Sequence, residues 1–130
     1  MAKSKLRELR EDYEARHNDD EIDETRLARF QFEGDKLRQA VNLETDGFHL
    51  EAIEIFKEIV ENAHSPSGAH RKLWQHYRKL EMYEQEIEVI ESYLSLFSEE
   101  PYIRFLNECK IEKAEKRLHV ARRLLIKKPG

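Results

Sequence analysis

The chain has 130 residues, 38% of them charged, with a formal net charge of −4 and only 4 glycines and 3 prolines. This length suits one domain that buries its own core, and the scarcity of turn-forming residues beside so many charges favours long surface helices. The acidic balance excludes a general electrostatic attraction to nucleic acid, and no apolar run reaches the roughly 18 residues that a membrane span needs. Cys109 is the only cysteine, so an internal disulfide is excluded and a cytoplasmic protein is expected.

The first 20 residues are predicted to form a segment of their own. Leu6, Leu9 and Tyr13 recur at spacings of three and four, which predicts a short amphipathic helix over residues 4–16. Residues 1–20 are then either mobile or docked on the first hairpin of a helical domain that spans residues 21–128.

A long amphipathic helix is predicted over residues 22–44. Gly34 lies on its apolar stripe and lowers the helix propensity by about 1 kcal/mol, so it indicates a close helix contact or a kink. Gly47 can adopt the left-handed conformation that ends a helix, and a second helix follows over residues 49–62. The apolar stripe of the first helix consists of Leu27, Phe30, Gly34, Leu37 and Val41.

Two further helices follow a sharp boundary. Ser65 is predicted as the N-cap of the third helix and Pro66 as its first residue, where proline's missing N–H does no harm. This helix runs to about residue 80 and carries Trp74, and a fourth helix spans residues 83–97.

The last part of the chain predicts a fifth helix and a final helix. Ser98 is expected to cap the fifth helix, which begins at Pro101. A break near residues 109–112 separates it from the last helix, and Cys109 is expected to be a buried thiol. The apolar residues of the last helix recur at three-four spacing: Ile111, Ala114, Leu118, Ala121 and Leu125.

The stretch from residue 40 to residue 94 repeats itself after 34 positions. A period of this length is typical of helical hairpins that cannot bury their apolar faces alone and must stack on neighbours. The matching pairs are Ile53 and Ile87, Glu54 and Glu88, Ile55 and Val89, Phe56 and Ile90, Ile59 and Tyr93, and Val60 and Leu94.

The turn Asp46-Gly47-Phe48, followed by Glu51-Ala52-Ile53 and Phe56, resembles a tetratricopeptide-repeat hairpin. Leu80 to Tyr83, followed by Glu86, Ile87 and Ile90, is similar to a second copy. The resemblance covers about residues 33–128 and implies a short right-handed α-solenoid of antiparallel hairpins with five to seven helices. The chain departs from the family pattern where Trp74 matches the small residue Ala40 and where Glu86 matches Ala52.

The same resemblance implies a groove formed by the first helices of successive hairpins, in which family members hold a peptide or a helix of another protein. It implies an adaptor, regulator or chaperone-like function, and self-association into a homodimer is a related expectation. An amphipathic partner helix with an acidic patch fits a surface that is apolar at its ends and basic in the middle. The alternative is that the apolar members of this surface are ordinary core. The groove residues implied are Leu37, Val41, Arg71, Gln75, Arg78, Tyr102 and Phe105.

The last helix offers a second hypothesis, contact with nucleic acid. Residues 110–128 hold eight basic residues, and Lys113, Arg117 and Arg123 are expected to project away from the apolar stripe. The simpler interpretation is that the acidic helix before it balances these charges.

No catalytic or cofactor site is expected. His64, His70 and His76 lie six residues apart, which places them on different helix faces, so they do not predict a zinc site. Cys109 has no neighbouring base and no nucleophile motif, so we expect no enzyme and no cofactor.

Overall fold

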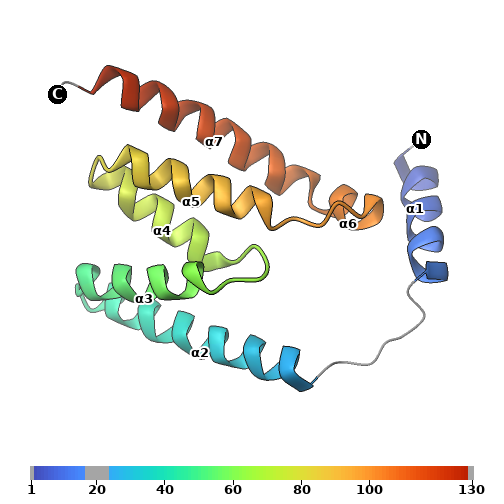
Figure 1. Ribbon diagram of the computed structural model, residues 1–130, viewed down its shortest axis with the longest axis horizontal. Coiled ribbons are helices and arrows are strands. Elements are labelled where there is room, and N and C mark those ends of the chain that lie inside the picture. The colour runs from blue at the N-terminus through green and yellow to red at the C-terminus, as the bar shows by residue number, and fades with distance from the viewer. Residues whose placement is uncertain (1, 17–23, 129–130) are drawn as a thin grey trace.

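The computed structural model describes residues 2–16 and 24–128, and within them the chain is helical apart from its turns (Figure 1). The predicted all-α class and the expected number of helices are confirmed. The seven helices in these residues are α1 (Ala2–Arg16), α2 (Glu24–Thr45), α3 (His49–Glu61), α4 (Gly68–Lys79), α5 (Tyr83–Ser95), α6 (Pro101–Leu106) and α7 (Glu108–Lys127).

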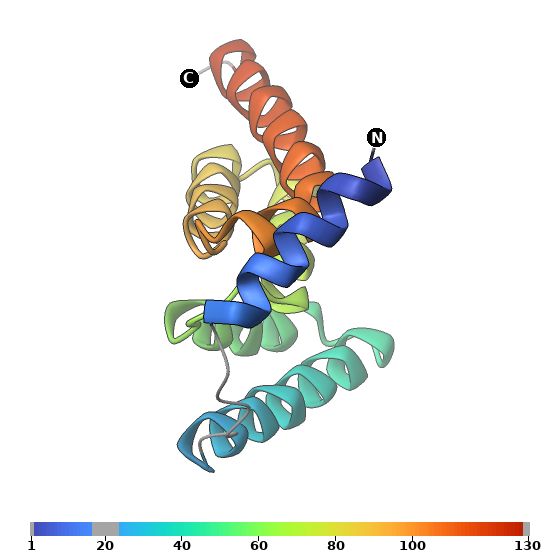
Figure 2. The same cartoon turned by 90° about the vertical axis from the view of Figure 1, so that its right-hand side faces the viewer.

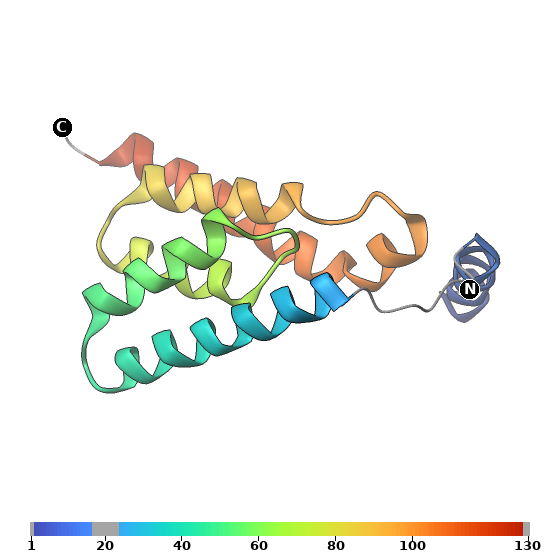
Figure 3. The same cartoon turned by 60° about the horizontal axis from the view of Figure 1, so that its bottom comes forward.

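The helices from α2 onward pack in chain order. α2 packs on α3, α3 on α4 and α4 on α5, so that the hairpins α2–α3 and α4–α5 lie side by side. The last layer is α7, which lies along α5 and follows the short α6 (Figure 3). α1 stands apart from these layers and contacts α6 (Figure 2).

The two hairpin turns have the same backbone hydrogen bonds, 34 positions apart. The N–H of Phe48 donates to the carbonyl of Leu43 at 2.8 Å, and the N–H of Met82 donates to the carbonyl of Tyr77 at 2.9 Å. The residue before each of these also donates, Gly47 to the carbonyl of Glu44 and Glu81 to that of Arg78, both at 3.1 Å. This pair of bonds is the Schellman helix ending, which requires a left-handed residue. Gly47 fills that position in the first turn with φ 90°, and Glu81 fills it in the second with φ 58°.

One continuous apolar core runs through the layers. Ala40, Ala52 and Phe56 are fully buried between α2 and α3, as is Ile90 in the second hairpin. Trp74 is also buried, and its ring meets that of Tyr93 edge-on with centroids 5.0 Å apart. The tryptophan that replaces a small residue of the repeat therefore fills the core with its own bulk.

A carboxylate is buried at the second departure from the repeat pattern. Glu86 is 0% exposed, as is Ala52 at the equivalent position of the first hairpin. Its two oxygens accept hydrogen bonds from Arg78 Nε at 2.7 Å and from Arg117 Nε at 2.9 Å. Because both oxygens are paired with guanidinium groups, the carboxylate is satisfied inside the core.

Helix starts differ from the predicted ones in two places. α4 begins at Gly68 with Ser67 as its N-cap, so the expected cap Ser65 and first residue Pro66 were wrong by two positions. His70 accounts for the shift, since its Nδ1 accepts the backbone N–H of Ser67 at 3.3 Å and so fixes the first turn. Similarly, the N-cap of α6 is Glu100, and Ser98 instead accepts the N–H of Glu100 through its Oγ.

The start of α2 extends beyond its partner. α2 has 22 residues and α3 only 13, so the first turns of α2 lie past the end of α3 and leave Leu27 and Phe30 exposed, Phe30 at 73%. Gly34 is exposed too, and a Cβ added there would meet no atom within 4 Å. The close contact expected at Gly34 is therefore absent from the described part of the chain.

Residues 2–16 form a docked helix, and the site of docking corrects the expectation. α1 lies against α6 and away from the first hairpin (Figure 1). Tyr13 and Tyr102 face each other with ring centroids 5.3 Å apart. Residues 17–20 of the expected N-terminal segment lie outside the described residues.

Candidate partner-binding groove

A groove runs between the inner faces of α2 and α4. Leu37 and Val41 of α2 form its apolar wall, and Arg71 and Gln75 of α4 form the opposite one. The resemblance implied that these four residues lie together, and the structure brings them together. Gly68 and Lys72 also line this part of the groove, which we call its α2 half.

A second half, a pocket of about 510 Å³, adjoins the first at the start of α4 and has room for several side chains of a bound segment. Gly68 and Arg71 line both halves, so the two halves are neighbours along α4. We call the second half the α6 half. Among its lining residues are Tyr13, Tyr93, Phe97, Glu100, Ile103, Asn107 and Lys110.

Two basic side chains in this groove are free. Within residues 2–16 and 24–128, neither Arg71 nor Lys110 forms an ion pair or a side-chain hydrogen bond, and both are exposed. Arg71 and Tyr93 both line the α6 half, and the charge of Arg71 opposes the rise that burial causes in the pKa of Tyr93. The free charges therefore lie next to apolar surface.

The third basic residue of the groove is neutralised. Lys72 donates to Glu44 at 2.8 Å, and His76 Nε2 lies 2.5 Å from the other oxygen of Glu44. Burial acts to raise the pKa of Glu44, but the hydrogen bonds from Lys72 and His76 outweigh it and leave that pKa lowered. Glu44 is therefore ionised, and it holds Lys72 against the side of the groove.

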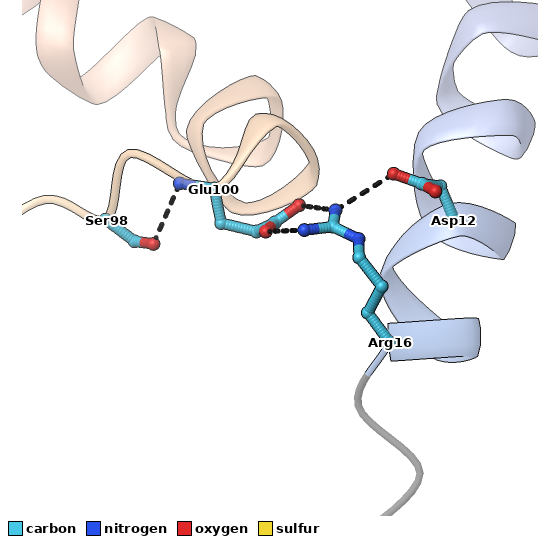
Figure 4. A network of polar contacts seen from close by, with 4 residues as sticks. All are labelled: Asp12, Arg16, Ser98 and Glu100. Atoms are coloured by element: carbon cyan, nitrogen blue, oxygen red, sulfur yellow. Dashed lines mark hydrogen bonds and ion pairs between the residues drawn. The ribbon is translucent and has the colours of Figure 1, made fainter.

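The acid of the α6 half is neutralised as well. Glu100 accepts hydrogen bonds from both terminal nitrogens of Arg16, one of them 2.8 Å long, and Arg16 also donates to Asp12 (Figure 4). With Glu44 and Glu100 both paired, the unbalanced charge of the groove comes from Arg71 and Lys110 and is positive.

Three residues implied by the resemblance do not line the groove. Arg78 turns toward α5 and α7, where it binds Glu86 and donates to the carbonyl of Arg117 at 3.4 Å. Tyr102 and Phe105 are half-buried on α6, and neither lines either half. The short α6 does not continue the repeat, so its register cannot be carried over from α2 and α4.

The basic face of α7 is smaller than expected. Arg117 was expected to project away from the apolar stripe, and this was wrong: its guanidinium binds buried Glu86 and lies over the ring of Trp74, 5.8 Å from the centroid. Lys113 and Arg123 are exposed as expected. The acidic helix α5 therefore balances part of α7, as the simpler interpretation proposed.

Cys109 is exposed, so the expected buried thiol was wrong. The buried stripe of α7 begins two residues later, at Ile111, and Cys109 lies off that stripe in the first turn. Among the residues that the structure describes, no group of three or more histidine, cysteine, aspartate or glutamate side chains could hold a metal ion.

His70 is the one buried histidine whose ring is incompletely paired. It is 0% exposed, and Nε2 is the only buried side-chain nitrogen or oxygen without a partner in the described part of the chain. Burial lowers the pKa of His70 to about 4, so the ring is neutral near pH 7. Its role is structural, because Nδ1 caps α4 from within the core.

Of the residues that line the α6 half, the sequence identified only Arg71, and Tyr13, Gly68, Asn107 and Lys110 are among those that it missed. Lys110 was counted among the charges of the last helix, and nothing in its spacing distinguished it from Lys113. What distinguishes it is the break at Asn107, which places the first turn of α7 beside the start of α4.

No family model, curated protein or solved structure matches this chain. Among the helices in the described residues, none combines the length and the apolar character needed to cross a bilayer.

Proposed function

We propose that this chain is a protein-interaction module of the tetratricopeptide-like kind, which holds an acidic amphipathic helix of another protein in the groove along α4. The observation that carries the proposal is the pair of free cations, Arg71 and Lys110, beside apolar groove walls. An apolar wall next to unpaired basic groups is the complement of a helix with apolar anchors and an acidic flank.

The apolar stripe of α2 supports a helical partner. Leu27, Phe30, Leu37 and Val41 lie on one face of α2, and the stripe from Leu27 to Val41 extends about 21 Å, or roughly four helical turns. Gly34 lies in its middle with open space in front of it. A helix laid along this stripe could approach α2 closely at the glycine, which would explain a residue that costs helix stability without an intrachain contact.

Selection from a peptide library tests the proposal by letting the groove choose its own ligand. A display library of 14-residue amphipathic helical peptides, with variable charge on the polar face, would be selected on the full chain. We expect the enriched peptides to be acidic and to bind at least tenfold more weakly to the double variant Arg71→Glu, Lys110→Glu, because charge reversal repels an acidic flank. Binding should also weaken as salt is raised.

The matched control is the double variant Lys113→Glu, Arg123→Glu, which reverses two exposed charges of α7 outside the groove. Both variants change the net charge equally, so only a local effect separates them. Equal loss of binding in the two variants, or enrichment of basic or uncharged peptides, would contradict the proposed groove.

A further inference from the structure

We infer that α1 is part of the binding site: it completes the α6 half of the groove and fixes its charge, so that α1 docking and the binding of an acidic partner strengthen each other. This inference rests on the proposed function and assigns a role to Tyr13 and Arg16, which lie outside the repeat.

The contacts of α1 converge on the groove. Tyr13 supplies part of the groove wall and faces Tyr102 of α6. One turn later, the guanidinium of Arg16 spans both oxygens of Glu100, as Figure 4 shows. The same helix thus provides a wall and a counter-ion to a single pocket.

Glu100 brings a negative charge into the α6 half of the groove. It is the N-cap of α6, and its N–H donates to Ser98 Oγ at 3.1 Å, which fixes the backbone at this corner. Its side chain is only 14% exposed and lies in the same half of the groove as Arg71 and Lys110. Arg16 brings a positive charge to this carboxylate, and removing that charge would make this half of the groove less favourable to an acidic segment.

The docking of α1 is weak enough to be shifted by a partner. Its ion pairs Arg7–Glu11 and Arg10–Glu14 are within the helix and highly exposed, and they contribute little to docking. Leu6 and Leu9 are only half-buried. An element with so little burial opens at low free-energy cost, and because coupling is reciprocal, a partner that prefers the docked form must stabilise it.

The experiment measures α1 docking and partner binding separately. Amide hydrogen exchange of α1 would be followed by mass spectrometry on the full chain, alone and with the acidic peptide enriched on it. We expect the peptide to slow exchange in α1 several-fold. Arg16→Glu should speed exchange in α1 and weaken peptide binding about three- to tenfold, since it replaces the attraction between α1 and Glu100 with a repulsion and makes this half of the groove more negative.

Two further variants make the result specific. The charge swap Arg16→Glu, Glu100→Arg should restore both slow exchange and peptide affinity, because it rebuilds the ion pair with its direction reversed. Arg10→Glu is the control: it reverses an exposed charge of α1 that pairs within the helix and should change neither affinity nor exchange beyond twofold.

The outcomes separate this inference from the proposed function. A peptide that binds while exchange in α1 is unchanged or faster would overturn the inference alone, and faster exchange would mark α1 as a displaced competitor. Unchanged or tighter binding to Arg16→Glu would overturn it too. If no peptide binds the wild-type chain, the proposed function fails, and the inference fails with it.

Discussion

The hairpins α2–α3 and α4–α5 end their first helices in the same way but bury different side chains. Both turns make the same hydrogen bonds 34 positions apart, whereas the buried residues at the matching positions are Ala40 and Ala52 in one hairpin and Trp74 and Glu86 in the other. The 34-residue period is therefore set by the backbone at the turns. The second hairpin can bury Glu86 because Arg78 and Arg117 neutralise its charge.

The largest expected effect comes from giving the first hairpin the acid of the second. In Ala52→Glu the new carboxylate would be buried, and the position equivalent to Arg78 is held by Glu44, an acid. We expect the free energy of unfolding to fall by more than about 4 kcal/mol, or the chain to remain unfolded. Urea unfolding followed by circular dichroism measures this. Leu50→Glu, at a 74% exposed site on the same helix, should stay within about 0.5 kcal/mol.

Removing the acid from the second hairpin should cost somewhat less. Glu86→Ala leaves Arg78 and Arg117 without their counter-ion, and breaking a buried pair costs roughly 3–5 kcal/mol. Both arginine side chains are 26% exposed and can reach water, so we expect a loss of about 3 kcal/mol in the same unfolding experiment. Glu88→Ala, an exposed glutamate of α5, is the control. A loss of stability no greater than that of Glu88→Ala would show that the second hairpin does not depend on the buried charge.

The helices could be predicted from the sequence because their signals are local, but the partners of their charged residues could not. The spacing of Ile111, Ala114 and Leu118 predicted the buried stripe of α7. That Arg117 turns inward depends on Glu86, 31 positions away, and on the fact that the second hairpin has this acid where the first has Ala52. A helical wheel of α7 contains neither fact.

The two halves of the groove also differ in how far they could be predicted from the sequence. The tetratricopeptide resemblance implied that Leu37, Val41, Arg71 and Gln75 lie together, and all four line the α2 half. The register ends after the second copy, since α6 and α7 meet at Asn107 without a further left-handed turn between them. Apart from Arg71, no sequence signal therefore marked the α6 half. Tyr13 lines this half only because α1 docks on α6.

The cap of α4 should make the free energy of unfolding depend on pH, because it contains the buried histidine His70. His70 has an ordinary pKa of 6.5 when unfolded and of about 4 when folded, so the unfolded chain binds a proton first. Its contribution is fully present above pH 6.5 and is lost as the pH falls toward 4. We expect about 2 kcal/mol less stability at pH 5 than at pH 7.5 from this residue.

The variant His70→Gln removes the titration and keeps the cap, because glutamine at this position can accept the N–H of Ser67. Its unfolding free energy should change less than that of wild type between pH 7.5 and pH 5. His119→Gln, at an exposed histidine of α7, should retain the wild-type pH dependence. Parallel pH curves for His70→Gln and wild type would mean that the buried ring is not the acid-sensitive group.

The smallest effects test whether the turns alone set the period. Gly47 and Glu81 occupy the same left-handed position with φ 90° and φ 58°, and a residue with a Cβ pays a steric cost there that glycine avoids. Gly47→Ala should lower the free energy of unfolding by about 1 kcal/mol, and Glu81→Gly should raise it by roughly 0.5–1 kcal/mol. The backbone carbonyl of Glu81 accepts the hydrogen bond of Lys128, so the glycine variant keeps that contact. Opposite signs in the two hairpins would show that the turns are equivalent in energy as well as in geometry, whereas a loss of stability in Glu81→Gly would mean that the glutamate side chain stabilises the second turn.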